Sequence, residues 1–265
     1  MLITASSLNT YTQCPRRYEY SYIKEKIPSA PQAALLVGTA VHIGIEAFWN
    51  KKDIVGSLAD VWEFFKESDF WDSDAGQLEK MKVRAYITGY YANRKDQLSQ
   101  HEVVAVEHEW TKTIDGMKFA GKIDLVLRDK RGRLILVDHK TSGSSDVDNP
   151  GSAFWRGLSY DTQMVLYREA LSEIAESNGA PTLLYDVVRK TKSKPAQRKR
   201  IAKKKSETTF EYEARKLANT ETGKEYGAKI LNTYTTDETR YIWREIPITQ
   251  DEATNKTEEI LHIGK

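Results

Sequence analysis

Two aspartates and a lysine within one short stretch have the residue types needed to bind a metal ion and act on a phosphate. Residues 118–142 read KFAGKIDLVLRDKRGRLILVDHKTS, with Asp124 in a first apolar run and Asp138 and Lys140 in a second. Mg²⁺ and similar hard cations take oxygen ligands, often one or two carboxylates, with waters and a phosphate completing the shell. An ammonium two residues beyond a ligand is placed to orient a water or to meet phosphate charge. These three residues are the first candidates for chemistry.

The turn between the two runs predicts how they pair. Residues 129–132, DKRG, suit a three-residue hairpin loop, with the aspartate opening a type I turn and the glycine left-handed. In that register Asp124 lies opposite Asp138. Lys122 lies opposite Lys140, and all four side chains share one face. Opposed carboxylates destabilise a ladder unless a cation offsets their repulsion, so we interpret the pair as a metal site. The alternative is an ordinary solvated sheet face, because a D-x-K triplet alone is common.

Both faces of this hairpin carry apolar side chains. The face opposite the carboxylates is expected to belong to the core and holds Ile123, Leu125, Leu127, Ile135 and Val137. Three more apolar residues share the face of the carboxylates: Val126, Leu134 and Leu136. Their presence argues against full solvation of that face and favours the metal site.

Length and composition predict one domain. The chain has 265 residues, 40% of them hydrophobic, which is enough to bury a substantial core. We expect a single domain over residues 1–265, with a helical N-terminal region over 1–100 and a catalytic core with a basic strip over 101–265. No apolar run approaches the roughly 18 residues of a membrane span. The N-terminus lacks the pattern of a signal peptide, so we expect a cytoplasmic protein.

Charge is unevenly distributed along the chain. The net charge of +2 conceals a basic strip over residues 189–205, RKTKSKPAQRKRIAKKK, with ten basic residues and no acidic one. Clustered lysines and arginines release counterions when they meet a nucleic-acid backbone. A solvated loop and a localisation signal are the alternatives. The predicted DNA-binding residues of the strip are Arg189, Lys190, Lys192, Lys194, Arg198, Lys199, Arg200, Lys203, Lys204 and Lys205.

The N-terminal region is predicted to be helical. Ser6 or Ser7 is expected to cap a first helix that ends near Cys14, because Pro15 disfavours helical geometry in the residue before it. Pro15 suits the first turn of a second helix over residues 15–26. On it, Arg16 and Arg17 stand beside three tyrosines and are candidates for contact with phosphates and bases. Packing of the tyrosines around a helix pair is the alternative.

The remaining elements are read from periodicity. A helix over residues 35–49 places His42 and Glu46 on one face, although a lone histidine there is more often structural than a ligand. A helix over residues 158–176 places Gln163 and Tyr167 one turn apart. The other expected elements are two or three helices over 54–100, a strand over 102–114, a loop over 143–157, a strand over 182–189, helices over 207–232, a strand over 238–248 and a helix over 252–261.

Five short motifs occur in order along the chain. They are C-P-x-x-Y from Cys14, G-x-x-x-H ending at His42, G-x-I-D ending at Asp124, D-x-K-T from Asp138 and Q-x-x-x-Y from Gln163. Together they resemble the RecB-like branch of the PD-(D/E)XK nuclease superfamily, which includes helicase-linked exonuclease domains, CRISPR-associated single-strand exonucleases and phage proteins. The resemblance implies an α/β fold, with a restriction-endonuclease-like mixed β-sheet flanked by helices and a helical N-terminal region.

The resemblance also implies a role for each matching residue. The implied metal ligands are His42, Asp124, Asp138 and the backbone carbonyl of His139. The implied catalytic set is Asp124, Asp138, Lys140, Gln163 and Tyr167, with the last two supporting the site and the DNA. The implied cofactor is Mg²⁺, and a histidine ligand also admits Mn²⁺.

Two positions depart from the family pattern. Many relatives pair the first cysteine with three near the C-terminus to hold an iron–sulfur cluster, but Cys14 is the single cysteine of this chain. We therefore predict no iron–sulfur cluster, and a strand over residues 241–249 in its place. His139 stands where relatives often have tyrosine, and its side chain should point to the core face, away from the metal.

The implied function is metal-dependent DNA exonuclease activity that hydrolyses phosphodiester bonds. We expect a preference for single strands or DNA ends, in phage or bacterial recombination, repair or DNA processing. A helicase or recombination protein is a candidate partner, and no membrane association is expected. The alternatives are a structure-specific or CRISPR-type endonuclease of the same fold and a non-catalytic DNA-binding module.

Overall fold

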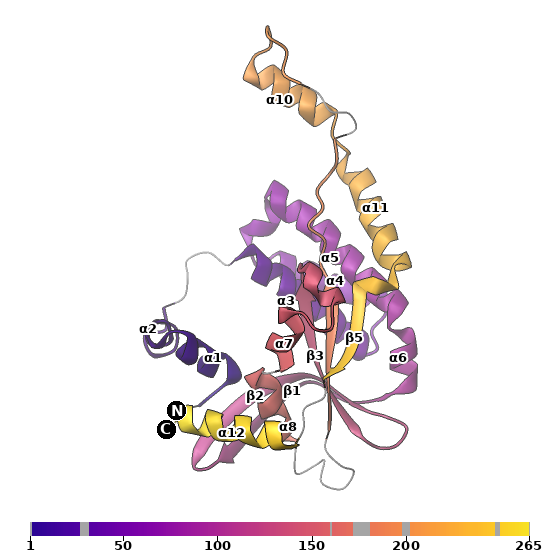
Figure 1. The fold of residues 1–265 in the computed structure, drawn as a ribbon. Helices are drawn as coiled ribbons and strands as arrows, with labels where there is room; N and C mark the ends of the chain where they lie inside the picture. Colours follow the sequence, from indigo (N-terminus) through magenta and orange to yellow (C-terminus); the bar gives the residue numbers. More distant parts are fainter. Residues whose placement is uncertain are drawn as a thin grey trace.

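The protein is built on one five-stranded mixed sheet. The computed structural model describes residues 2–26, 32–159, 161–171, 181–197, 202–246 and 250–264. The strand order is β1-β2-β3-β4-β5 (Figure 1). The strands are β1 (Glu102–Ile114), β2 (Met117–Arg128), β3 (Leu134–Ser142), β4 (Thr182–Arg189) and β5 (Tyr241–Ile246). β3 and β4 are parallel, and the other neighbouring pairs are antiparallel. The predicted mixed sheet flanked by helices is confirmed.

Helices precede the sheet, cross over it and follow it. Before it come α1 (Ala5–Gln13), α2 (Pro15–Tyr18) with a π-helical turn (Glu19–Ile23), α3 (Ala33–Trp49), α4 (Ile54–Phe65), a 3-10 turn (Asp69–Asp72), α5 (Asp74–Asn93) and α6 (Lys95–Gln100). A 3-10 turn (Ser145–Asp148), α7 (Ala153–Ser159) and α8 (Thr162–Ala170) connect β3 to β4. After β4 come α10 (Thr209–Ala218), α11 (Gly223–Thr236), a 3-10 turn (Glu238–Arg240) and, after β5, α12 (Gln250–Gly264). The predicted helical N-terminal region is confirmed. Among the described helices, none is long and apolar enough to cross a membrane.

Two apolar clusters lie on opposite faces of the sheet. One joins α3, α4, α5 and α11 to the face of Leu125 and Val137. The other joins α1, α8 and α12 to the face of Val126 and Leu136. Figure 1 shows α10 held away from these layers, at the far end of an arm that leaves the sheet after β4 and returns through α11.

The predicted hairpin register is confirmed as far as the ladder extends. Leu125 pairs with Val137, and the pairing continues in the same register to the turn. Gly132 has φ of 83°, the left-handed conformation that the loop requires. The ladder ends at the Leu125–Val137 pair, so the predicted pairing of Lys122 with Lys140 does not form. β2 and β3 therefore separate just where the two aspartates lie.

One predicted core residue packs on the other face. Ile123 is buried as expected, but it belongs to the cluster of Val126 rather than that of Leu125. The alternation of faces is broken at Asp124. Opposite this point in β1, between the pairs that join β1 to Leu125 and to Ile123, Glu107 has φ of 53°. A non-glycine residue rarely adopts positive φ, and such strain often marks a functional site.

Two helix starts differ from the prediction. The N-cap of α1 is Thr4 rather than Ser6 or Ser7, because Thr4 and Ser7 form a reciprocal capping box. The helix still ends before Pro15, as predicted. The helix predicted over residues 158–176 is interrupted, since Asp161 caps a new helix that begins at Thr162, and residues 172–176 lie outside the described part. The predicted loop over 143–157 contains the 3-10 turn and most of α7.

A buried ion pair fixes β4 to the helices behind the sheet. Asp186 is fully buried, and Arg94 donates to its Oδ1 from Nη2 at 2.7 Å and from Nε at 3.2 Å. Tyr90 donates to Oδ2 at 2.5 Å, and His139 Nδ1 lies 3.2 Å from the same oxygen. Burial would raise the pKa of Asp186, but Arg94 and His139 hold it well below its ordinary value. The His139 side chain points to this buried side, as predicted.

We expect Arg94→Ala to destabilise the protein by about 3–5 kcal/mol, because it leaves a fully buried carboxylate without its cation. Urea unfolding measures the change. The matched control is Arg84→Ala, which removes an exposed arginine of α5 and should change the free energy of unfolding by about 0.5 kcal/mol at most. Equal effects of the two variants would contradict a structural role for the ion pair.

Candidate active site

The two predicted carboxylates lie at the point where β2 and β3 part. The Asp124 side chain is 14% exposed and that of Asp138 is 2% exposed. Oδ2 of Asp124 accepts a hydrogen bond from the backbone N–H of His139 at 2.8 Å. Lys140 Nζ lies 2.7 Å from Oδ2 of Asp138. Residues of β3 thus supply a backbone hydrogen-bond donor to Asp124 and an ammonium to Asp138.

Helix α8 positions Lys140 from the side of the apolar cluster that contains Val126 and Leu136. Lys140 Nζ donates to Gln163 Oε1 at 3.3 Å. Gln163 Nε2 donates to the Tyr167 hydroxyl, which in turn donates to the backbone carbonyl of Lys122. That carbonyl lies beyond the end of the β2–β3 ladder. The structure therefore brings Gln163 and Tyr167 to Lys140 and connects β2 to β3 through side chains.

His42 reaches the site from α3, on the side of the apolar cluster that contains Leu125 and Val137. Its Nδ1 lies 3.9 Å from Oδ2 of Asp124, and 34% of its side chain is exposed. Burial lowers the pKa of His42 to about 4, with Asp124 opposing the shift and His139 and Lys140 adding to it. The imidazole is therefore neutral at pH 7, the state in which histidine binds a metal.

The charges of the site shift the pKa values of its other groups. Burial raises the pKa of Asp138 to about 7; Lys140 opposes this shift, and Asp124 adds to it. Burial would lower the pKa of Lys140, but Asp138, Asp161 and Asp124 raise it above its ordinary value. Lys140 therefore stays charged at neutral pH, while Asp138 is close to its titration point.

The residues present fit a divalent cation. Oδ2 of Asp138 is buried and makes no hydrogen bond of acceptable geometry in the described part of the chain, although Lys140 lies close to it. Two carboxylates and a neutral imidazole are a suitable donor set for Mg²⁺ or Mn²⁺. Across the described residues, no three such side chains already surround one point. Oδ2 of Asp124 accepts from the His139 amide instead.

Three acidic residues of the site were not singled out from the sequence. Asp161 caps α8 by accepting from the Gln163 N–H at 3.0 Å and contributes to the electrostatics of Lys140. The sequence signal for this helix start was the aspartate itself, because aspartate is a preferred N-cap residue. Glu107 pairs with Lys122 at 2.5 Å. Burial raises the pKa of Glu107, with Lys122 opposing this shift and Asp124 adding to it. The third residue is Asp186, whose place in the centre of the apolar run TLLYDVVR was the sequence signal for a buried charge that needs a cation.

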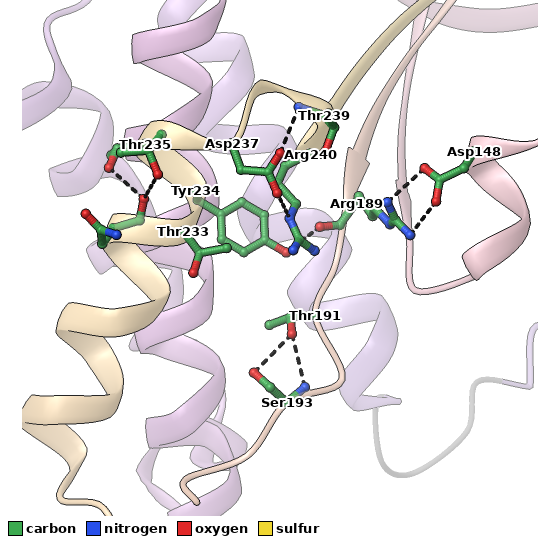
Figure 2. A network of polar contacts seen from close by, with 12 residues as sticks. Asp148, Arg189, Thr191, Ser193, Thr233, Tyr234, Thr235, Asp237, Thr239 and Arg240 are labelled. Atoms are coloured by element: carbon green, nitrogen blue, oxygen red, sulfur yellow. Dashed lines mark hydrogen bonds and ion pairs between the residues drawn. The ribbon is translucent and has the colours of Figure 1, made fainter.

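The predicted DNA-binding residues lie outside this centre. Arg16 and Arg17 are exposed on α2, where Tyr18 stacks on Tyr22 with ring centroids 5.3 Å apart. Arg189 forms a bidentate ion pair with Asp148 (Figure 2). Lys190 is half-buried, and Lys192, Lys194, Lys203, Lys204 and Lys205 are exposed. Arg198, Lys199 and Arg200 lie outside the described residues.

The chain was compared with protein families, with curated sequences and with solved structures. The family model of the PD-(D/E)XK nuclease superfamily matches residues 2–241. A crystal structure described as a "putative exonuclease" from Eubacterium rectale superposes with a TM-score of 0.55 at 12% identity, covering 99% of this chain and 81% of that one. A crystal structure of SSO0001 gives a TM-score of 0.37 at 14% identity, covering 99% and 76%. No curated protein sequence matches the chain significantly.

We expect the affinity for Mn²⁺ to fall about tenfold per pH unit below pH 7, because the cation must displace the proton that Asp138 holds there. Above pH 7 the carboxylate is ionised, and the affinity should level off. Titration calorimetry between pH 5.5 and 8.5 measures the profile. Asp138→Asn should bind weakly and without an inflection near pH 7. A flat wild-type profile would exclude Asp138 as a ligand.

Proposed function

The chain belongs to the PD-(D/E)XK nuclease superfamily, and we propose that it is a metal-dependent DNA exonuclease of the RecB-like branch. It hydrolyses phosphodiester bonds and prefers single-stranded DNA or DNA ends. The observation that carries this proposal is the meeting of Asp124 and Asp138 where β2 and β3 part, with Lys140 ion-paired beside them. A stable fold does not require two carboxylates and a lysine at that point.

In this proposal Asp124, Asp138 and His42 hold Mg²⁺ or Mn²⁺ together with the backbone carbonyl of His139. A bound divalent cation lowers the pKa of a water molecule and neutralises charge that grows on the phosphate. The neutral imidazole of His42 offers a lone pair at the pH where the carboxylates are ionised. The His139 amide holds the Asp124 carboxylate at the site through a hydrogen bond to Oδ2.

Lys140 acts as a fixed cation rather than as a base. An ammonium has three N–H donors; Lys140 directs one to Gln163, and its charge is paired with Asp138 at 2.7 Å. A further N–H remains to orient the attacking water or to donate to a phosphate oxygen. Gln163 and Tyr167 fix the direction of the ammonium through the hydrogen bonds that end on the Lys122 carbonyl.

The basic strip supplies affinity for the DNA backbone. Its exposed lysines lie along the arm that carries α10. Residues 189–205 include no aromatic side chain that would stack on bases. Such contacts bind phosphates without reading sequence. Arg16 and Arg17 on α2 add two further exposed cations, beside tyrosines that can stack on unpaired bases.

Recombination, repair or DNA processing in phage or bacteria is the proposed setting, with a helicase or recombination protein as partner. The Eubacterium rectale protein of the same fold is itself described as a "putative exonuclease". End-labelled linear DNA and closed circular DNA, each incubated with Mg²⁺ or Mn²⁺, separate the reaction types. Cutting of the closed circle would show that the protein is an endonuclease, because a circle has no ends. No hydrolysis with either metal would favour a non-catalytic DNA-binding module.

We expect Asp124→Ala and Asp138→Ala each to reduce metal-dependent cleavage by about 10³-fold, because each removes a ligand of the cation. Both variants should fold, since Asp138 is a buried carboxylate whose charge is unfavourable at its position. Release of label from linear DNA measures the rate, and circular dichroism checks the fold. Glu109→Ala, an exposed carboxylate on β1, is the matched control with unchanged rate. Substantial activity in either aspartate variant would remove the metal-site argument.

We expect the triple variant Lys203→Gln, Lys204→Gln and Lys205→Gln to bind single-stranded DNA more weakly and with a shallower salt dependence. The slope of log K against log salt should fall by about 0.7 for each lost phosphate contact, or about 2 in total. Fluorescence anisotropy across salt concentrations gives the slope. The control is Lys95→Gln, Lys118→Gln and Lys130→Gln, which removes the same charge from exposed sites elsewhere. If the slope of log K against log salt were the same for both triple variants, the basic strip would not be a DNA-binding surface.

A further inference from the structure

A second concave site lies near the candidate active site, between the first turn of α3, α5 and the segment that follows β4. It is a pocket of about 360 Å³. Its charged lining consists of Lys82, Lys190, Lys192 and Glu79, and Val37 lies among its apolar lining residues. Lysines therefore outnumber carboxylates three to one around the pocket.

Two of the three lysines have no carboxylate partner in the part of the chain that the structure describes. Lys82 is 6% exposed and pairs with Glu79 at 2.7 Å. Within the described residues, no salt bridge joins Lys190 or Lys192 to an acidic side chain. Burial lowers the pKa of Lys190, and Glu79 opposes that shift only in part. An anion in the pocket would restore the balance.

The start of α3 adds to the positive potential of the pocket. Ala33 and Ala34, the first two residues of the helix, line it. Gln32 provides no side-chain cap, and the first turn of α3 has no acidic residue. An uncapped helix N-terminus carries a partial positive charge and favours anions. It therefore acts in the same direction as the lysines.

The backbone of the lysine-bearing segment is held by its neighbours, which sets where its lysine side chains begin. It is bonded to α5, α11 and β3 at four of the five residues from 189 to 193. The bonds run from Tyr234 OH to the Arg189 carbonyl, from Lys190 N–H to the Ser142 carbonyl at 2.6 Å, from Thr191 N–H to Tyr86 OH at 3.1 Å, and from Tyr226 OH to the Ser193 carbonyl at 2.7 Å. Figure 2 shows this exit from β4, with Arg189 also held by Asp148.

Two elements connect the pocket to the active site. On α3, His42, Gly38 and Ala34 follow one another at one-turn intervals, so Ala34 lies about 12 Å from His42 at 1.5 Å per residue. Directly after β3, Gly143 lines the pocket and lies about 10 Å beyond Lys140 at about 3.3 Å per residue. Gly38 packs near Thr141 between these points, where an added Cβ would lie 3.7 Å from the threonine hydroxyl. The pocket and the carboxylates are thus about 10–12 Å apart along both elements.

We propose that this pocket is a phosphate-binding subsite of the nuclease, which anchors the nucleic-acid strand about 10–12 Å from the bond that is cleaved. Lys190 and Lys192 bind the phosphate, Lys82 and the N-terminus of α3 complete the positive lining, and Glu79 holds Lys82 in place. The proposal rests on the proposed function, because it supplies the strand. The phosphate is either an internal diester of the strand or a terminal monoester.

Binding without metal tests the subsite apart from catalysis. Fluorescence anisotropy in EDTA compares single strands that end in a 5′-phosphate, a 5′-hydroxyl or a 3′-phosphate, with a single-stranded circle as a fourth probe. The variant Lys190→Gln with Lys192→Gln should bind about tenfold more weakly than wild type. A loss confined to one phosphorylated end identifies a terminal monoester as the ligand. An equal loss on all four probes identifies an internal diester.

Two further variants separate binding from folding and from bulk charge. Ala34→Asp places a carboxylate in the pocket wall at a helix N-terminus, where it should preserve or increase stability while it repels phosphate. It should therefore weaken binding without lowering Tm. The control pair Lys95→Gln with Lys130→Gln removes the same charge elsewhere and should weaken binding less than twofold. If the pocket variants bind like wild type or like this control, the subsite is refuted.

The two proposals can fail separately. Absence of hydrolysis by the wild-type protein with Mg²⁺ and Mn²⁺ would refute the exonuclease and leave the anisotropy result standing. If hydrolysis occurs, the Lys190 and Lys192 variant should raise KM about tenfold and change kcat by less than about twofold, because the pocket binds the strand away from the reacting atoms. A loss in kcat alone would contradict an anchoring role.

Discussion

Repulsion between two carboxylates is the constraint on which the centre of this molecule depends. The hairpin of β2 and β3 pairs regularly up to Leu125 and Val137 and then separates where Asp124 and Asp138 would face each other. Burial raises the pKa of Asp138, so its negative charge is maintained at a cost. The amide of His139 and the ammonium of Lys140 reduce that cost. A divalent cation would reduce it further, and this is the physical basis of the proposed chemistry.

The two faces of β3 serve different purposes. On one face Lys140 is held by Gln163 and Tyr167 of α8. On the other, the His139 side chain lies against Asp186 in a fully buried network that also includes Arg94. Alternation along one strand thus connects the proposed catalytic side chains to a buried ion pair behind the sheet. A site held from both faces keeps its geometry with little freedom to relax.

Charge is arranged to suit a polyanion that is both held and cleaved. The centre is acidic and would attract a cation, whereas the pocket at the start of α3 and the arm after β4 are lined with lysines. A strand held by the lysines could pass its phosphates to the carboxylates without strong repulsion, provided that a metal ion neutralises the centre. The tyrosines that hold the exit of β4 keep the nearest lysines at a fixed distance from that centre.

The sequence by itself determined the features that depend on local rules. Turn chemistry set the register of the hairpin up to the Leu125–Val137 pair and thereby placed Asp124 and Asp138 directly beyond it. Alternating hydrophobicity located β1, and an apolar run located β4. Only the tertiary structure decided where the ladder ends, because that depends on repulsion and on the β1 residue with positive φ, Glu107. It also decided that His42 lies 3.9 Å from Asp124 and that Lys82 joins the lysines after β4 in one pocket. These residues are remote in sequence, and packing of helices on the sheet, which no local pattern encodes, sets their distances.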